Sequence, residues 1–199
     1  MTHGRIMIVT VMLVLVGTWA YAADCKNGGR YEDSGHGTVT DCRTGMIWLK
    51  DARCTDTSSG IANPTGELTW YDAMKWVAGL HSGLCGLSDV SGVGDWRLPT
   101  KTEWMAMVAY ARKQGFTSPP LTNATGTAQW TTNGDAFDNV TLDFYWSSTS
   151  YAPDTRGAYV IHISSDGHTD GNWSKDGNNF KVWPVRGGQS GSFGTVFIE

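Results

Sequence analysis

Four cysteines, all in the first half of this 199-residue chain, constrain its fold more than any other feature: Cys25, Cys42, Cys54 and Cys85. An even number of cysteines in an exported protein is typical of a disulfide framework. Four cysteines allow three pairings, and spacing alone does not choose among them. We favour Cys25–Cys42 with Cys54–Cys85, because the first pair flanks a predicted hairpin and the second ties a loop across the first predicted helix. A zinc site is disfavoured, since the sequence has no Cys-x-x-Cys or His-x-x-x-His spacing.

The N-terminal residues indicate export. Met1–Arg5 holds one basic residue and no acidic one, Ile6–Val16 is an almost unbroken apolar run, and Ala20-Tyr21-Ala22 places small residues around a bulky one. This order is typical of a secretory signal peptide, and the apolar run is too short to span a bilayer. The sequence therefore predicts a signal peptide over residues 1–22, a periplasmic or secreted location, and no stable membrane insertion after cleavage.

The rest of the chain is acidic and rich in aromatic residues. Fifteen Lys and Arg face 19 Asp and Glu, and loss of Arg5 with the signal peptide changes the net charge from −4 to −5. Such a surface is a poor partner for nucleic acid. Ten Trp and 25 Gly indicate a loop-rich fold around a compact aromatic core.

Turn and capping signals divide the chain into short elements. Thr69 can cap a helix over Trp70–Leu80, and Thr100 with Glu103 forms a capping box that opens a second helix, which Gly115 ends. A polar stretch as long as Thr117–Asp143 is either functional or held by packing. The Asp-, Gly- and Asn-rich Ser164–Asn179 is predicted to be a loop. Strands are predicted at Arg30–Asp33, Thr38–Asp41, Met46–Leu49, Phe144–Ser148, Ala158–Ile163 and Lys181–Val185.

Several recognisable runs follow one another in a fixed order: Gly37–Asp41, Thr44–Trp48, Asp95–Thr100, Tyr145–Thr149 and Val182–Gly188. Over about residues 28–188 these runs resemble the Lcl C-terminal domain family, which is named for a bacterial collagen-like adhesin. The resemblance implies an α+β, C-type-lectin-like fold in which two helices flank a small twisted antiparallel sheet with long loops. It also implies an exported binding or adhesion domain, placed here at residues 23–188 and followed by a tail over residues 189–199. The chain contains no collagen-like repeat.

The segment Arg97–Trp104, with Pro99, Thr100 and Glu103 within it, also resembles the formylglycine-generating, sulfatase-modifying branch of C-type-lectin-like folds; with Trp96 these residues form one motif. That chemistry needs a late pair of reactive cysteines, and no cysteine follows Cys85. A structural role is therefore expected, in which Pro99 sets the turn into the second helix and Arg97 binds loop carbonyls or pairs with Glu103. Trp96, Trp104, Trp146 and Trp183 are expected to fill the core.

Arrangements that could carry metal chemistry or catalysis are incomplete. The Glu-Pro-Asn and Gln-Pro-Asp signatures of calcium-dependent sugar binding are missing from the sequence. The run Asp166–Gly171 resembles a calcium loop, but its third position is His168 and the closing acid is replaced by Gly177, which favours a solvated turn. The acids Asp135, Asp138 and Asp143 could serve a glycosidase, but their spacing is ordinary for a polar loop. We expect no metal, no cofactor and no catalytic residue.

Recognition through the loops of the C-terminal half is the remaining prediction. Aromatic faces beside amides and hydroxyls can stack on sugars or anchor a protein, although Tyr159 and Trp173 could instead simply plug the sheet. The sequence predicts an exported binding module for a glycan or a surface protein, of undetermined oligomeric state; a structural envelope component and a polysaccharide hydrolase are the alternatives. A polyanionic ligand is disfavoured by the net charge unless Arg156, Lys175, Lys181 and Arg186 cluster. The candidate ligand-binding residues are Tyr151, Arg156, Tyr159, Trp173, Lys175 and Asn178.

Overall fold

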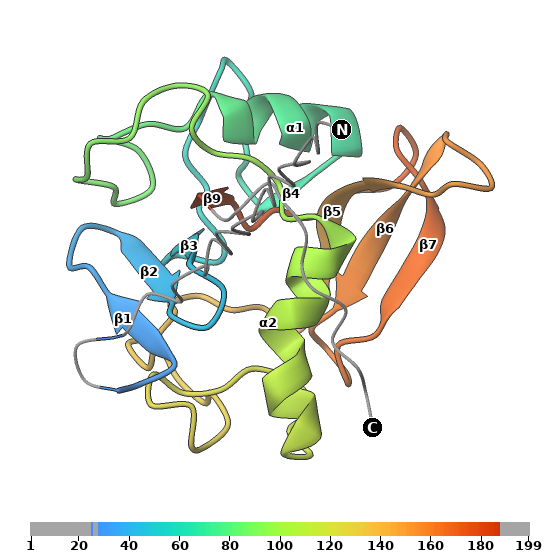
Figure 1. The fold of residues 1–199 in the computed structure, drawn as a ribbon. Coiled ribbons are helices and arrows are strands. Elements are labelled where there is room, and N and C mark those ends of the chain that lie inside the picture. The colour runs from blue at the N-terminus through green and yellow to red at the C-terminus, as the bar shows by residue number, and fades with distance from the viewer. Residues whose placement is uncertain (1–24, 26–27, 188–199) are drawn as a thin grey trace, which may run out of the picture.

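The computed structural model describes Cys25 and residues 28–187 (Figure 1). Within that part of the chain, two helices and nine strands form a mixed α+β fold, as predicted. Neither helix there has the length and apolar character needed to cross a membrane. The predicted signal peptide (residues 1–22) and tail (residues 189–199) lie outside the described residues.

The strands form two sheets. The first is antiparallel and has the order β1 (Tyr31–Asp33), β2 (Thr38–Asp41), β3 (Met46–Leu49) and β9 (Val185–Gly187). The second has the order β4 (Glu67–Leu68), β8 (Phe180–Lys181), β5 (Phe144–Ser150), β6 (Gly157–His162) and β7 (Thr169–Ser174). In this second sheet β5 and β8 run parallel, while the other neighbours are antiparallel.

The prediction of a single small sheet was wrong, and the C-terminal strand shows why. The predicted strand Lys181–Val185 is two strands, β8 in the second sheet and β9 in the first. Between them, fully buried Trp183 carries the chain from one sheet to the other. Pro184 has no N–H to offer a ladder, and its carbonyl accepts a hydrogen bond from the backbone N–H of Leu49, 3.0 Å away.

Strand β7 was also missed, because its residues were predicted to form a loop. Its side chains alternate between half-buried and exposed along Thr169–Ser174, the period of two that a strand requires. It lies at the edge of the second sheet, where one side of the backbone needs no partner strand. An edge position tolerates the Asp, Gly and Asn that argued against a strand.

Both helices begin where their caps predicted. Helix α1 (Trp70–Ala78) is capped by Thr69 at its start and by Gly79 at its end, and its last residue lies two residues before the predicted end, Leu80. Helix α2 (Lys101–Lys113) starts with the complete Thr100–Glu103 capping box. It ends at Gly115, which has a φ of 77°; the N–H groups of Gly115 and Phe116 bond back to Arg112 and Ala111, the Schellman pattern. In Figure 1, α2 is drawn between the β1–β2 hairpin and the β6–β7 hairpin.

A cluster of aromatic rings fills the space between the sheets and the helices. Trp48, Trp104, Trp183 and Tyr145 make ring contacts with centroids 4.9–5.8 Å apart. The indole N–H of Trp104 donates to the carbonyl of Trp146 at 3.1 Å, and that of Trp183 donates to the carbonyl of Leu49 at 2.7 Å. The prediction that four tryptophans fill the core is confirmed, since Trp96, Trp104, Trp146 and Trp183 are at most 1% exposed.

The long polar stretch before β5 is held by packing. Leu121, Trp130 and Phe137 are buried, and the Trp130 indole N–H donates to the carbonyl of Phe137 at 3.1 Å. The backbone N–H groups of Arg30 and Tyr31 both donate to the carbonyl of Ala124 at 2.9 Å. Of the two roles open to a loop this long, the structure supports the structural one.

The favoured cysteine pairing is confirmed. Cys25–Cys42 and Cys54–Cys85 form disulfides with Cα–Cα distances of 5.6 and 5.4 Å. The first ties the N-terminal segment to the turn that follows β2, and the second ties the loop after β3 to the loop after α1. Both crosslinks lie in the half of the chain that precedes the β6–β7 hairpin.

Candidate binding surface on the β6–β7 hairpin

The segment Trp96–Trp104 has the geometry of a structural joint. Arg97 donates to both carboxylate oxygens of Glu103 at 2.7 Å and to the carbonyls of Leu98 and Gly187, so it fulfils both roles predicted for it. Burial raises the pKa of Glu103, but the hydrogen bonds from Arg97 and from the Thr100 N–H lower it more, and the pKa lies below its ordinary value. The pair fastens the start of α2 to the end of β9.

The predicted ligand-binding residues separate into different faces of the β6–β7 hairpin. Trp173 pairs with Ala158 across the two strands, and paired residues share a face of a sheet while successive residues alternate. Tyr159 therefore lies on the face opposite Trp173. Tyr151, at the end of β5, lies on the side of Tyr159, because the two rings contact edge to face with centroids 5.5 Å apart.

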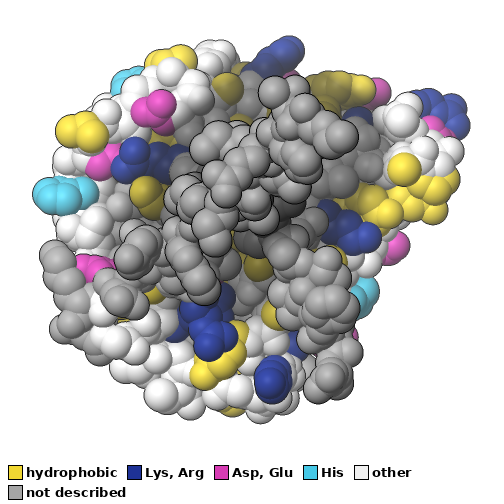
Figure 2. Space-filling view, in the orientation of Figure 1, with side chains coloured by type: hydrophobic (Ala, Val, Ile, Leu, Met, Phe, Trp, Pro, Cys, Tyr) yellow, Lys and Arg dark blue, Asp and Glu magenta, His cyan; other side chains and the backbone are white. Residues whose placement is uncertain are grey.

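We call the side chains around this pair the tyrosine face: Tyr151, Tyr159, Gly171 and Lys101. Both tyrosines are half-buried, and the Lys101 ammonium lies 3.9 Å from the Tyr159 ring centroid. A side chain at Gly171 would overlap the Tyr151 ring and lie 2.9 Å from Cε1 of Tyr159. The missing side chain at Gly171 thus lets both rings lie against the backbone of β7. Figure 2 shows hydrophobic side chains gathered over this hairpin, with Lys or Arg beside them.

The opposite face carries a second row of rings. Trp173 contacts Phe180 and Phe144, with centroids 5.2 and 5.9 Å away. Phe144 also stacks on His162 at 4.0 Å, and His162 stacks on His168 at 3.9 Å. Trp173 is half-buried among these neighbours, as expected if it plugs the sheet.

Two further candidates, Lys175 and Arg156, lie by the β5–β6 loop, at the end of the β6–β7 hairpin away from its turn. Lys175 is only 6% exposed, and its ammonium donates to Oγ of Ser150 at 2.6 Å and to the carbonyl of Thr155 at 2.9 Å. It therefore holds the β5–β6 loop from inside and cannot reach a ligand. Arg156 is exposed and forms two hydrogen bonds to Asp154, which lower the pKa of that carboxyl group to about 2.

The last candidate and the other late basic residues lie away from the tyrosine face. The backbone N–H of Asn178 donates to Ser174 in the turn after β7. The Lys181 ammonium pairs with Glu67 at 2.6 Å, and Arg186 pairs with Asp89 at 2.7 Å. Each of the late basic side chains Arg156, Lys175, Lys181 and Arg186 thus engages a carboxylate, a hydroxyl or a carbonyl of the protein itself.

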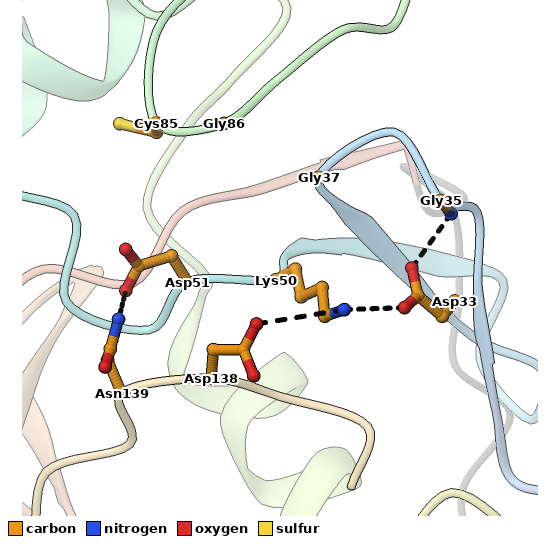
Figure 3. A pocket seen from close by; sticks show the side chains of 9 residues that line it. All are labelled: Asp33, Gly35, Gly37, Lys50, Asp51, Cys85, Gly86, Asp138 and Asn139. Atoms are coloured by element: carbon orange, nitrogen blue, oxygen red, sulfur yellow. Dashed lines mark hydrogen bonds and ion pairs between the residues drawn. The ribbon is translucent and has the colours of Figure 1, made fainter. Parts of the chain in front are cut away.

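A polar depression of about 340 Å³ lies away from the hairpin, between the β1–β2 turn, the disulfide-bonded loop at Cys85 and the 138–139 loop (Figure 3). The Lys50 ammonium lies 2.7 Å from Asp33 and 3.8 Å from Asp138, and the Asn139 amide donates to Asp51. Asp33 raises the pKa of Lys50. The charged and amide groups that line the depression can donate hydrogen bonds to hydroxyls and accept them, so the depression can hold a small polar molecule.

Two groups of potential metal ligands occur among the described residues: Cys25, Glu32 and Cys42, and Cys54, Asp56 and Cys85. In each group both sulfurs belong to a disulfide, which is not the thiolate that binds a metal. In the predicted solvated turn, Asp166 accepts hydrogen bonds from the backbone N–H and the ring Nδ1 of His168. The absence of a metal and of a catalytic group stays a prediction.

Sequence reasoning missed two members of the tyrosine face, Lys101 and Gly171. Lys101 opens α2, where its backbone N–H donates to Oγ1 of Thr149, and only the packing of α2 beside β6 brings its side chain to Tyr159. Gly171 was predicted to lie in a loop. Strict two-residue alternation along β7 would place Gly171 on the face of Trp173, and only the register shift between β6 and β7 turns it toward Tyr159. No sequence signal points to this shift or to Lys101.

Comparison with known proteins gives one informative result. The model of the Lcl C-terminal domain matches residues 37–186. The match extends from the start of β2 into β9, and it includes both helices and the complete β6–β7 hairpin. No curated protein and no solved structure matches the chain.

Proposed function

The chain belongs to the Lcl C-terminal domain family, and from that premise we propose that it is an exported recognition module that binds a glycan through the tyrosine face. The fold proposed for it is the C-type-lectin-like one that the sequence resemblance implies. The observation that carries the proposal is the pair of half-buried tyrosine rings held against Gly171. Such rings can stack on the C–H faces of a sugar while their hydroxyl groups form hydrogen bonds.

The hairpin is held in one shape before any ligand arrives. Lys175 fastens the β5–β6 loop by two hydrogen bonds from its ammonium, and its backbone N–H donates to the carbonyl of Arg156 at 3.0 Å. A binding surface that is already ordered loses less conformational entropy on association. This rigidity supports recognition by the tyrosine face and agrees with a role for Lys175 beneath the surface.

The charge pattern favours an uncharged glycan. The chain is net negative, and the late basic side chains Arg156, Lys181 and Arg186 are paired with carboxylates. The Lys101 ammonium lies over the Tyr159 ring, where the ring's negative face stabilises it. We therefore propose that binding depends little on salt, in contrast to recognition of a polyanion.

Two disulfides support the exported part of the proposal, because disulfides persist in oxidising compartments outside the cytosol. A location in the periplasm or outside the cell follows from the same reasoning. The proposed partner is accordingly a glycan of the envelope or the surroundings.

Immobilised glycans at low and high salt provide the test. Tyr159→Ala should lower affinity for the retained glycan about tenfold, or about 1.4 kcal/mol, at both salt concentrations. Tyr110→Ala is the matched control, since Tyr110 is a half-buried tyrosine whose ring also carries a basic side chain, Arg43, at 4.0 Å. Retention of no glycan, or equal losses in both variants, would contradict the proposal; a protein captured by crosslinking in intact cells would then point to a surface protein.

A further inference from the structure

Three Asn-x-Ser/Thr sequences, the acceptor pattern for N-linked glycosylation, occur in the chain: Asn123-Ala124-Thr125, Asn139-Val140-Thr141 and Asn172-Trp173-Ser174. A transferase can use such an asparagine only if the side-chain amide is accessible. The structure distinguishes the three by what each amide touches.

Two of the three amides are engaged in the fold. Oδ1 of Asn123 accepts hydrogen bonds from the backbone N–H groups of Thr127 and Ala128, at 3.0 and 3.2 Å. The side-chain nitrogen of Asn139 donates to Oδ1 of Asp51 at 3.0 Å. Both side chains therefore hold loops in place, and these contacts restrict the access of a transferase to their amide groups.

Asn172 differs in position and in surroundings. It is exposed on the edge strand β7, with a φ of 67°, where the β6–β7 register shifts opposite Ala158 and Val160. A Cβ at Gly157 would lie 2.9 Å from Cα of Asn172, so this glycine leaves the asparagine its space. Among the described residues, no hydrogen bond engages the Asn172 side chain.

The acceptor sequence at Asn172 also has a distinct charge. Asp170, two residues before it, is exposed, whereas Leu121 and Phe137 occupy the same place before Asn123 and Asn139. A carboxylate at this distance gives an enzyme an ionic contact by which to select one sequence over the others.

We propose that Asn172 is the acceptor of an N-linked glycan, transferred from a lipid-pyrophosphate-linked oligosaccharide by an oligosaccharyltransferase. The amide nitrogen forms a bond to the anomeric carbon of the sugar, the bond from that carbon to the pyrophosphate oxygen breaks, and the amide nitrogen loses one proton. A glycan there would shield the open edge of β7 from other strands. The proposal rests on export of the chain and is independent of glycan binding by the tyrosine face.

The test is expression of the full chain in a bacterial periplasm that contains an oligosaccharyltransferase and its lipid-linked oligosaccharide, followed by intact-mass measurement. The wild-type chain should gain the mass of one glycan. Asn172→Gln should remove that gain, whereas Asn139→Gln, the matched exposed control with a positive φ, should keep it. Asp170→Asn should lower occupancy at least tenfold.

Substitutions at Ser174, the third position of the acceptor sequence, test the proposal with Asn172 unchanged. They are needed because the left-handed backbone at residue 172 suits Asn better than Gln, so that Asn172→Gln can disturb the fold. Ser174→Ala should abolish the added mass and Ser174→Thr should retain it, with both disulfides intact by thiol labelling. An unmodified wild-type chain, or a glycan that persists in Asn172→Gln, would overturn the proposal.

Discussion

The two aromatic regions of this protein contain similar side chains in opposite situations. In the core, Trp104 and Trp183 are fully buried, and their indole N–H groups donate to backbone carbonyls. Tyr159 on β6 and Tyr151 just after β5 contact each other at a similar ring spacing but remain half-buried. Ring contacts alone therefore do not distinguish a structural aromatic from one available to a ligand. What distinguishes the two is whether other parts of the fold cover the ring on both sides.

The largest effect should come from emptying the core. Trp104→Ala removes a ring that contacts three other aromatic side chains, and it should lower the free energy of unfolding by about 3–5 kcal/mol. Denaturant unfolding measures the loss. Tyr159→Ala provides the comparison, and an equally large loss there would show that the tyrosine face is part of the core after all.

A smaller stability effect with a large binding effect is expected on the hairpin. Gly171→Ala places a Cβ against both tyrosine rings, which should displace them, lower stability by about 1–3 kcal/mol and weaken glycan retention about tenfold. Gly92→Ala is the control, since a Cβ there would meet only Oδ2 of Asp95, at 3.9 Å. If Gly171→Ala retained full binding, the arrangement of the rings would be irrelevant to recognition.

Acidification should lower the stability of the β6–β7 hairpin and of the structural joint at Trp96–Trp104 in different pH windows. Burial and the neighbouring His168 lower the pKa of His162 on the hairpin below its ordinary 6.5. The pKa of Glu103 in the structural joint also lies below its ordinary 4.5, because hydrogen bonds from Arg97 and the Thr100 N–H outweigh burial.

A lowered folded-state pKa contributes stability above the unfolded-state pKa, and that stability is lost as the pH falls through the folded-state value. His162→Gln should thus flatten the stability profile below about pH 6.5, and Glu103→Gln should flatten it below about pH 4.5; Gln also preserves the capping box. Unfolding free energies measured from pH 3 to pH 8 test both, and profiles unchanged in both windows would refute the assignment.

The smallest effect is expected in the β5–β6 loop. Arg156→Ala removes an exposed ion pair with Asp154, and exposed pairs contribute little to stability. The unfolding midpoint should not change measurably, and binding of an uncharged glycan should not change either. A salt-dependent loss of binding in this variant would instead indicate an anionic ligand.

Local signals predicted much of the fold. The caps at Thr69 and Thr100 located both helix starts, because a cap and its helix are adjacent in sequence. Strand β7 and the division of Lys181–Val185 between two sheets were missed, since both depend on which distant strands lie alongside. For the site, the candidates Tyr151, Tyr159 and Lys175 were all named from the sequence, but burial depends on distant packing and only the structure shows that Lys175 is buried.

By itself the sequence determined the family resemblance, the even set of cysteines, the aromatic load and the helix starts, because each is carried by neighbouring residues or by composition. Only the tertiary structure decided that the strands form two sheets, that Tyr159 and Trp173 face opposite ways, and that Lys101 from α2 lies on the Tyr159 ring. These features depend on register and on packing between segments far apart in the chain, and a shift of one residue in register reverses the face on which every side chain lies.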